Sequence, residues 1–258
     1  MENGSPIPDD PAGLSLRDVT LCYRRHPAVH HLTGCFAAGS LTAVVGPNGA
    51  GKTTLLKGLA GLMRPTEGGI VRQGFGQCEM AYLPQQAEID RAFPMMVSDV
   101  VAMGHWRRVG ILRPVDAPLR ERIRDALAAV GLDGFSRRPI ASLSAGQFQR
   151  VLFARMLLQD ASVILLDEPF NAIDARTTAD LLALIRRWHG ERRTVIAVLH
   201  DIDQVRENFP ETLLLARERI AWGPTSDVLT AENRLRARGM AEAWNESAAP
   251  CDSRGQVA

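Results

Sequence analysis

The chain has 258 residues, 46% of them hydrophobic and 23% charged; the length fits one large domain with a subdomain, and the composition excludes wholesale disorder. Thirty basic and twenty-nine acidic residues leave a formal net charge of +1, which supplies no field to hold nucleic acid. Only two of the basic residues are lysines, Lys52 and Lys57, so a lysine within a chemical motif is informative.

No apolar run reaches the roughly 18 to 20 residues that a membrane span requires. Residues 1–11 are acidic and proline-rich, unlike a secretory signal. The four cysteines are scattered and form no CxxC pair, which is expected for reduced thiols. They are Cys22, Cys35, Cys78 and Cys251. These features predict a cytoplasmic chain.

The first clear strand pattern is the apolar run at residues 41–45, and the pattern after it predicts a helix that Pro65 ends. One face of this helix carries Leu55, Leu56, Leu59, Leu62 and Met63.

Residues 163–166 and 194–199 are β-rich runs without polar alternation, as expected for central strands covered on both faces. The helix pattern between them has one apolar face, made of Leu181, Leu182, Ile185 and Trp188. This strand–helix–strand order predicts an α/β fold with a mainly parallel sheet.

Residues 87–142 differ because they show little strand signal, and we expect a mainly helical subdomain inserted there. One side of its helix carries Leu119, Ile123, Ala126, Leu127 and Val130. Further on, residues 212–215 and 220–222 flank Arg217 and predict a hairpin, which a last helix over 231–244 follows. The folded domain is placed at residues 13–245, with flexible tails at 1–12 and 246–258.

A glycine-rich segment after the strand at 41–45 fits the pattern G-x-x-x-x-G-K-[ST] of a phosphate-binding loop. Its glycines let backbone N–H groups wrap around phosphates, and the following helix adds a favourable dipole. Lys52 would reach the β- and γ-phosphates of ATP, and the Thr53 hydroxyl would bind Mg²⁺. The predicted ATP-binding residues are Gly46, Pro47, Asn48, Gly49, Ala50, Gly51, Lys52, Thr53 and Thr54.

Two adjacent carboxylates, Asp167 and Glu168, follow the apolar run at 163–166. Asp167 is placed to hold Mg²⁺, and Glu168 is placed to polarise an attacking water as a general base. Such a pair alone is equally typical of a solvated turn, but after a phosphate loop it favours hydrolysis.

The segment Leu143-Ser144-Ala145-Gly146-Gln147 resembles the LSGGQ signature of the nucleotide-binding subunits of ATP-binding cassette (ABC) transporters. Its hydroxyl and backbone amides ahead of a helix make a second anion site, although Ser144 as a plain helix cap is the alternative. Ser144 lies 23 residues before Asp167, which matches the family's layout. The resemblance implies that Ser144, Ala145, Gly146 and Gln147 contact ATP. Ala145 replaces the usual glycine, and alanine resists positive φ.

The resemblance spans about residues 14–244 and implies four further site residues. Gln85 resembles the Q-loop glutamine, near Mg²⁺ and the attacking water, and Asp174 resembles the aspartate of the D-loop. His200 resembles the switch histidine, which makes it a catalytic residue with Glu168 and Gln85. Tyr23 stands where the family has an aromatic that stacks on adenine. A packing role for Tyr23 and a loop role for His200 are the alternatives.

In this family two copies pair head to tail, and each ATP lies between the phosphate loop of one copy and the signature of the other. The resemblance therefore implies an ABC ATPase fold with an N-terminal antiparallel β portion, and a second copy of the chain as partner. It also implies membrane permease subunits, contacted through residues 93–104, and indirectly a periplasmic or extracellular metal-binding protein. The chain would then lie at the inner face of the cell membrane.

The sequence around the motifs resembles that of the ATPases of zinc and manganese importers, with zinc favoured. The segments that carry this resemblance are residues 82–90, 93–94, 170–174 and 198–201. An importer of iron-siderophore complexes or haem is the closest alternative. A DNA-repair ABC ATPase would place a long coiled coil between phosphate loop and signature, but 98 residues without sustained heptads separate Gly46 from Ser144. A non-hydrolysing regulator would lack Glu168.

Three histidines, His26, His30 and His31, gather in a segment that we expect to be a solvated turn between strands. Without carboxylate or cysteine partners they do not predict a metal site.

Overall fold

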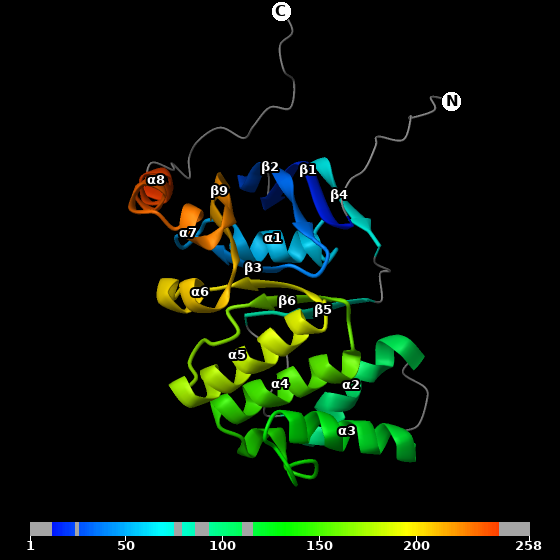
Figure 1. Cartoon of the computed structure of the whole chain (residues 1–258). Coiled ribbons are helices and arrows are strands. Elements are labelled where there is room, and N and C mark those ends of the chain that lie inside the picture. The colour runs from blue at the N-terminus through cyan, green and yellow to red at the C-terminus, as the bar shows by residue number, and fades with distance from the viewer. Residues whose placement is uncertain (1–11, 24–25, 75–78, 86–92, 110–115, 243–258) are drawn as a thin grey trace, which may run out of the picture. The chain divides into compact units, whose positions relative to one another are not determined.

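The computed structural model describes residues 12–23, 26–74, 79–85, 93–109 and 116–242. The chain divides into two compact units, coloured by residue number in Figure 1. Unit 1 takes its described residues from the stretches 1–75 and 200–258, and unit 2 from 76–199. The predicted tails lie almost wholly outside the described residues, as do Arg24, Arg25, Cys78, Trp244 and Cys251.

Unit 1 contains the antiparallel β portion that the resemblance implies. Its three strands pair in the order β2-β1-β4, all antiparallel. They are β1 (Gly13–Tyr23), β2 (His26–Ala37) and β4 (Glu67–Gln73). Leu14, Leu16 and Phe36 are buried on this sheet. The antiparallel portion is therefore confirmed.

The expected turn around the histidines is wrong, because His26, His30 and His31 lie within β2. Their expected lack of carboxylate partners is wrong as well. His31 Nδ1 lies 2.8 Å from Asp18 Oδ1, and His30 Nδ1 lies 3.2 Å from Glu218 Oε1. Among the described residues, no group of three or more potential ligands is arranged to hold a metal ion.

Unit 1 also contains a strand set that leads into the phosphate loop. β3 (Leu41–Val45) pairs in parallel with β8 (Glu211–Ala216), and β8 pairs antiparallel with β9 (Glu218–Pro224), which confirms the predicted hairpin. The helices of this unit are α1 (Lys52–Leu59), α6 (Ile202–Asn208), α7 (Thr225–Val228) and α8 (Ala231–Glu242).

Helix α1 is shorter than the sequence pattern predicts. It ends at Leu59, so Leu62 and Met63 lie beyond it, and the Leu62 side chain is 68% exposed. The reason is Gly61, whose φ of 76° starts the turn in which Leu62 N–H donates to the Lys57 carbonyl. A glycine in this left-handed conformation is the usual helix stop.

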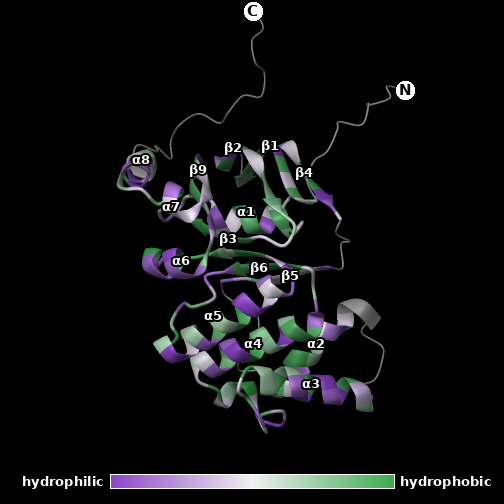
Figure 2. Ribbon diagram, viewed as in Figure 1, coloured by the Kyte–Doolittle hydropathy of each residue, from purple (hydrophilic) through white to green (hydrophobic). Residues whose placement is uncertain are grey.

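Unit 2 contains the parallel sheet that the strand–helix–strand pattern predicts. β5 (Met80–Leu83), β6 (Val163–Asp167) and β7 (Thr194–Val198) pair in parallel in that order. α5 (Ala175–Gly190) connects β6 to β7 and buries Leu181, Ile185 and Trp188, the face expected from its spacing. Figure 2 shows hydrophobic and hydrophilic segments alternating along α4 and α5, as helices with one buried face require.

The part of the predicted helical insertion that the structure describes is helical. α2 (Val97–Val109) and α3 (Ala117–Ala129) both contact α4 (Ala145–Gln159), and a short 3-10 turn at Ile140–Ser142 precedes α4. The buried face of α3 includes Leu119, Ile123 and Leu127, as predicted. The boundaries of the insertion stay a prediction, because residues 86–92 and 110–115 lie outside the described part of the chain.

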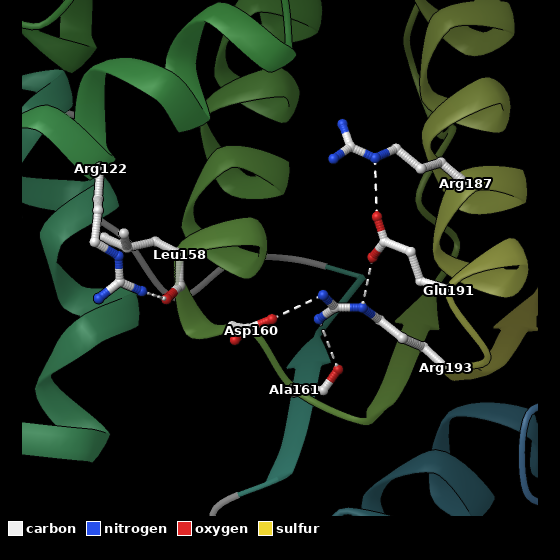
Figure 3. Close-up of polar contacts among 7 residues, drawn as sticks. All are labelled: Arg122, Leu158, Asp160, Ala161, Arg187, Glu191 and Arg193. Carbon is white, nitrogen blue, oxygen red and sulfur yellow. Dashed lines mark hydrogen bonds and ion pairs between the residues drawn. The ribbon is translucent and has the colours of Figure 1, made fainter.

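A network of charged side chains ties two loops of unit 2 together (Figure 3). Arg193, which directly precedes β7, donates to Glu191 Oε2 at 2.9 Å, to the Ala161 carbonyl at 3.1 Å and to Asp160 Oδ1 at 2.7 Å. Glu191 also accepts from Arg187 at 2.9 Å. Because Asp160 and Ala161 precede β6, this network joins the amino ends of two neighbouring strands.

Candidate functional site

The phosphate loop of unit 1 runs from β3 into the first turn of α1. Gly46 and Gly51 have positive φ, and a Cβ on either would collide with a backbone carbonyl, that of Leu215 or that of Ala28. Only glycine fits such close backbone packing at positive φ. The loop therefore packs tightly against β8 and β2, and this packing explains why Gly46 and Gly51 are glycines.

Lys52 is the first residue of α1 and only 6% exposed. Its Nζ atom donates to the carbonyls of Gly46 at 2.8 Å and Pro47 at 2.9 Å, so the ammonium lies inside the curve of the loop. Asn48 and Gly49 at the tip are exposed, whereas Ala50 and Thr54 are buried and Thr53 is half-buried. A compact cation, loop amides and a helix N-terminus are the groups that bind a polyphosphate.

The predicted adenine-stacking residue, Tyr23, is the last residue of β1 and is 47% exposed. It pairs with His26 across the β1–β2 hairpin. About half of the Tyr23 surface is therefore accessible at a strand end, and adenine stacking by this residue stays a prediction.

In unit 2 the two predicted carboxylates lie at the carboxyl end of β6. Asp167 is 1% exposed, and Tyr82 Oη lies 3.4 Å from its Oδ2 atom. Glu168 has a positive φ of 50°, and its N–H donates to the Val198 carbonyl at the end of β7. The end of β6 thus carries two successive carboxylates, Asp167, which is buried, and Glu168, which is partly exposed.

The side chains of Gln85 and Glu168 are in contact, although they lie far apart in the sequence. Gln85 Nε2 donates to Glu168 Oε2 at 2.7 Å, and Asn171 Nδ2 lies 3.5 Å from the same oxygen. Asn171 and Tyr82 had no predicted role, although both stand inside the predicted motifs. For Asn171 the available signal was an amide three residues after Glu168, whereas Tyr82 lies 85 residues from Asp167 in the sequence and gave no such signal.

The signature segment and the predicted D-loop aspartate also lie close together in unit 2. Ser144 is the N-cap of α4, and its hydroxyl and the Gln147 side chain form a capping box. A Cβ on Gly146 would lie 3.4 Å from Asp174 Oδ2 and 3.3 Å from Thr177 Oγ1. Ala145 is the first residue of α4 and has no positive φ, so its methyl group adds no backbone strain.

Asp174 is the N-cap of α5, and its carboxylate accepts from the Thr177 N–H and hydroxyl, both at 2.8 Å. These two hydrogen bonds lower the pKa of the Asp174 carboxyl below its usual value. The side chain of His200, the predicted switch residue, is exposed just before Asp201, whose carboxylate caps α6.

Comparison with known proteins decides the family. The family model described as ABC transporter matches residues 29–171, which hold the phosphate loop, the signature and both carboxylates. The chain belongs to the ABC transporter family. It is an ATPase of the kind that binds and hydrolyses ATP in these transporters. No helix in the described parts of this family member is long and apolar enough to cross a membrane.

Two relatives and one solved structure show how far the similarity reaches. The zinc transport system ATP-binding protein TroB of Treponema pallidum is 41% identical over 233 residues, 88% of this chain and 86% of that protein. The manganese transport system ATP-binding protein MntB of Bacillus subtilis is 37% identical over 231 residues, 88% and 92% of the two chains. An inward-facing putative metal-chelate type ABC transporter superposes with a TM-score of 0.77 at 31% identity, covering 87% of this chain and 88% of that chain.

Proposed function

We propose that this ABC ATPase powers the import of a divalent metal ion, zinc or manganese. The observation that carries the proposal is the 35–41% identity, over most of the chain, to ATP-binding proteins of zinc and manganese transport systems. Transport would require a polytopic permease, and indirectly a metal-binding protein outside the membrane. The chain would then lie at the cytoplasmic face of the membrane, bound to the permease.

The proposed residue roles follow from the chemistry of each group. Lys52 and the N–H groups of the loop from Gly46 to Thr54 bind the phosphates, and Tyr23 stacks on adenine. Glu168 takes a proton from the attacking water, while Gln85 orients the Glu168 carboxylate through the 2.7 Å contact. His200 is the proposed switch residue that senses the γ-phosphate.

Thr53, Gln85 and Asp167 would hold Mg²⁺. Hydroxyl, amide and carboxylate oxygens are the donors that this hard cation prefers, so these side chains fit it. When bound, Mg²⁺ neutralises charge on the phosphates.

A second copy of the chain completes the proposal. One chain carries one phosphate loop and one signature segment, and the signature residues Ser144, Ala145, Gly146 and Gln147 are proposed to contact the ATP of the partner copy. Residues 93–104 are the proposed permease contact, and Phe93 and Met96 are exposed there.

The test of the cargo is uptake by the assembled transporter in vesicles. ATP-dependent uptake of zinc or manganese, with no uptake of a ferric siderophore or haem, would support the proposal. Uptake of an iron complex with no response to zinc or manganese would contradict it.

A matched pair of lysine variants tests the ATP site in the same vesicles. Lys52→Ala removes the cation inside the loop and should abolish both hydrolysis and uptake. Lys57→Ala, at the other end of α1, should leave both unchanged. Near-normal hydrolysis in Lys52→Ala would show that the loop is not the site of ATP turnover.

A further inference from the structure

Arg217 is the residue between β8 and β9, and both of its backbone polar groups contact segments far away in the sequence. Its N–H donates to the carbonyl of Ala50 in the phosphate loop at 2.9 Å, and its carbonyl accepts from the His30 N–H in β2 at 2.8 Å. Its φ of 64° is unusual for a residue with a long side chain. The backbone of Arg217 therefore adopts an uncommon conformation in which it makes both of these contacts.

The Arg217 side chain reaches the same strand near its start. Its Nη1 atom donates to the Pro27 carbonyl at 3.0 Å. Pro27 is buried and follows His26, the residue that pairs with Tyr23 across the β1–β2 hairpin. One residue therefore links the phosphate loop to the hairpin that carries the exposed Tyr23 ring, and all of these contacts lie within unit 1.

The neighbouring packing leaves little freedom between these segments. Gly51 of the phosphate loop approaches the Ala28 carbonyl of β2, and Gly46 approaches the Leu215 carbonyl of β8, so closely that neither tolerates a Cβ. A charged hydrogen bond to a carbonyl is stronger than a neutral one. Arg217 can therefore set where the start of β2 lies relative to the loop.

We propose that Arg217 is a positioning residue that fixes the separation between Tyr23 and the phosphate loop. This spacing would let one ATP engage the ring and the loop at once, so Arg217 favours the nucleotide over a bare triphosphate. The inference rests on the proposed role of Tyr23. Pre-organising two subsites for one ligand increases affinity by lowering the ordering cost of binding.

The experiment compares binding of ATP and of inorganic tripolyphosphate to the isolated full chain by calorimetry at constant Mg²⁺. Arg217→Ala keeps the backbone contacts and removes the guanidinium. It should weaken ATP binding about tenfold, the loss expected for one charged hydrogen bond that orders a site, and change tripolyphosphate binding by less than about twofold. Arg217→Lys, which keeps a cation that can donate to Pro27, should recover part of the ATP affinity.

Arg219→Ala is the matched control. Arg219 lies on the same hairpin and donates to the Thr33 carbonyl of β2 at 3.0 Å, away from the Tyr23 end of the strand. It should leave both affinities unchanged. Equal losses for ATP and tripolyphosphate in Arg217→Ala, no loss for either, or the same ATP loss in Arg219→Ala would each overturn the inference.

Tyr23→Ala separates this inference from the function on which it rests. It should weaken ATP binding and leave tripolyphosphate binding intact. If its ATP affinity is unchanged, the proposed adenine contact is wrong whatever Arg217 does. If Tyr23→Ala weakens ATP binding and Arg217→Ala does not, only the positioning role is wrong. Retained tripolyphosphate binding also reports that each variant has folded with an intact loop.

Discussion

The two ends of strand β6 hold their carboxylates with different donors. Near the amino end of β6, where the start of β7 lies beside it, Asp160 and Glu191 accept from arginines, and Arg193 donates to both and to the Ala161 carbonyl (Figure 3). At the carboxyl end, Glu168 accepts from the amide of Gln85 at 2.7 Å. Both ends belong to unit 2, so the comparison is made within one folded unit, and what differs between the ends is the chemical type of the hydrogen-bond donor.

This difference shows how one strand serves two purposes. A forked guanidinium that donates to two carboxylates and a carbonyl fixes the loops it joins, since charged and bidentate hydrogen bonds are the strong ones. An amide is a neutral donor, so it orients a carboxylate without the opposition to proton uptake that a neighbouring cation would supply. We therefore propose that the amino end stabilises the fold and that the carboxyl end carries the chemistry, and matched substitutions at the two ends can test this contrast.

The largest effect is expected at Glu168. Glu168→Gln keeps the size of the side chain and removes the base, which typically costs about 10²- to 10⁴-fold in rate. ATP affinity and the free energy of unfolding should stay near those of the parent, because the phosphate loop is unchanged. Steady-state hydrolysis, nucleotide titration and urea unfolding measure the three quantities.

Glu191→Gln at the amino end is the control for this variant. It makes the same chemical change in a carboxylate that accepts from two arginines, and it should lower stability by less than about 1 kcal/mol without changing the hydrolysis rate. If Glu168→Gln hydrolysed ATP at the parent's rate, Glu168 would not be the general base, and the proposed difference between the two ends of β6 would be wrong.

The next largest effect is a loss of stability at Arg193. Arg193→Ala removes three hydrogen bonds of a side chain that is only 20% exposed, and it should lower the free energy of unfolding by about 1–3 kcal/mol. Arg187→Ala removes one ion pair of a 64% exposed side chain and should cost less than about 0.5 kcal/mol. Urea unfolding distinguishes the two, and a reduced rate per folded molecule in Arg193→Ala would contradict a purely stabilising role.

The sequence draws attention to the carboxyl end of β6, the proposed functional end, more than to the amino end. Asp167 and Glu168 stand out because apolar residues and a proline surround them, and the phosphate loop stands out because its glycines follow from backbone sterics. These are local constraints, and local patterns reveal them. The parallel sheet of unit 2 and the buried face of α5 follow from hydrophobic periodicity in the same way.

Arg193 and Arg217 carry no such local signal. Each acts through carbonyls and carboxylates that folding brings close from distant parts of the chain, and arginines are too common here to single them out. The end of α1 before Leu62 could be predicted from the sequence, because Gly61 is a typical helix stop. The expectation of a turn at the histidines is wrong because β2 begins at His26 and contains all three of them.

A smaller effect is expected at Gln85, the amide donor of the functional end. Gln85→Ala leaves Glu168 without this 2.7 Å contact, and it should lower the hydrolysis rate about tenfold while stability stays constant. Asn171→Ala removes a contact of 3.5 Å, at the limit of a hydrogen bond, and should have a smaller effect. If Asn171→Ala slowed hydrolysis more than Gln85→Ala, the orienting role would pass to Asn171.

The smallest effect is expected at Asp174. Its carboxylate accepts from a backbone N–H and a hydroxyl, which are neutral donors like the amide of Gln85, but these donors also cap a helix. The Thr177 hydrogen bonds lower its pKa, so the folded state favours the charged form more than the unfolded state does. Its contribution to stability is therefore present in full above the unfolded pKa of about 3.9 and is lost as the pH falls through the lower folded pKa.

Asp174→Asn keeps a good helix cap but does not ionise, so at neutral pH it should be less stable than the parent, which has the contribution of the ionised carboxylate. Below about pH 4, where the parent loses the contribution of the ionised carboxylate, the two unfolding curves should converge. Urea midpoints from pH 3 to 7 measure this. A difference that persists unchanged through acid pH would show that the Asp174 charge does not stabilise the fold. A fall in hydrolysis rate at neutral pH with unchanged stability would place Asp174 with the catalytic end, because the capping geometry is preserved and only the charge beside Gly146 is gone.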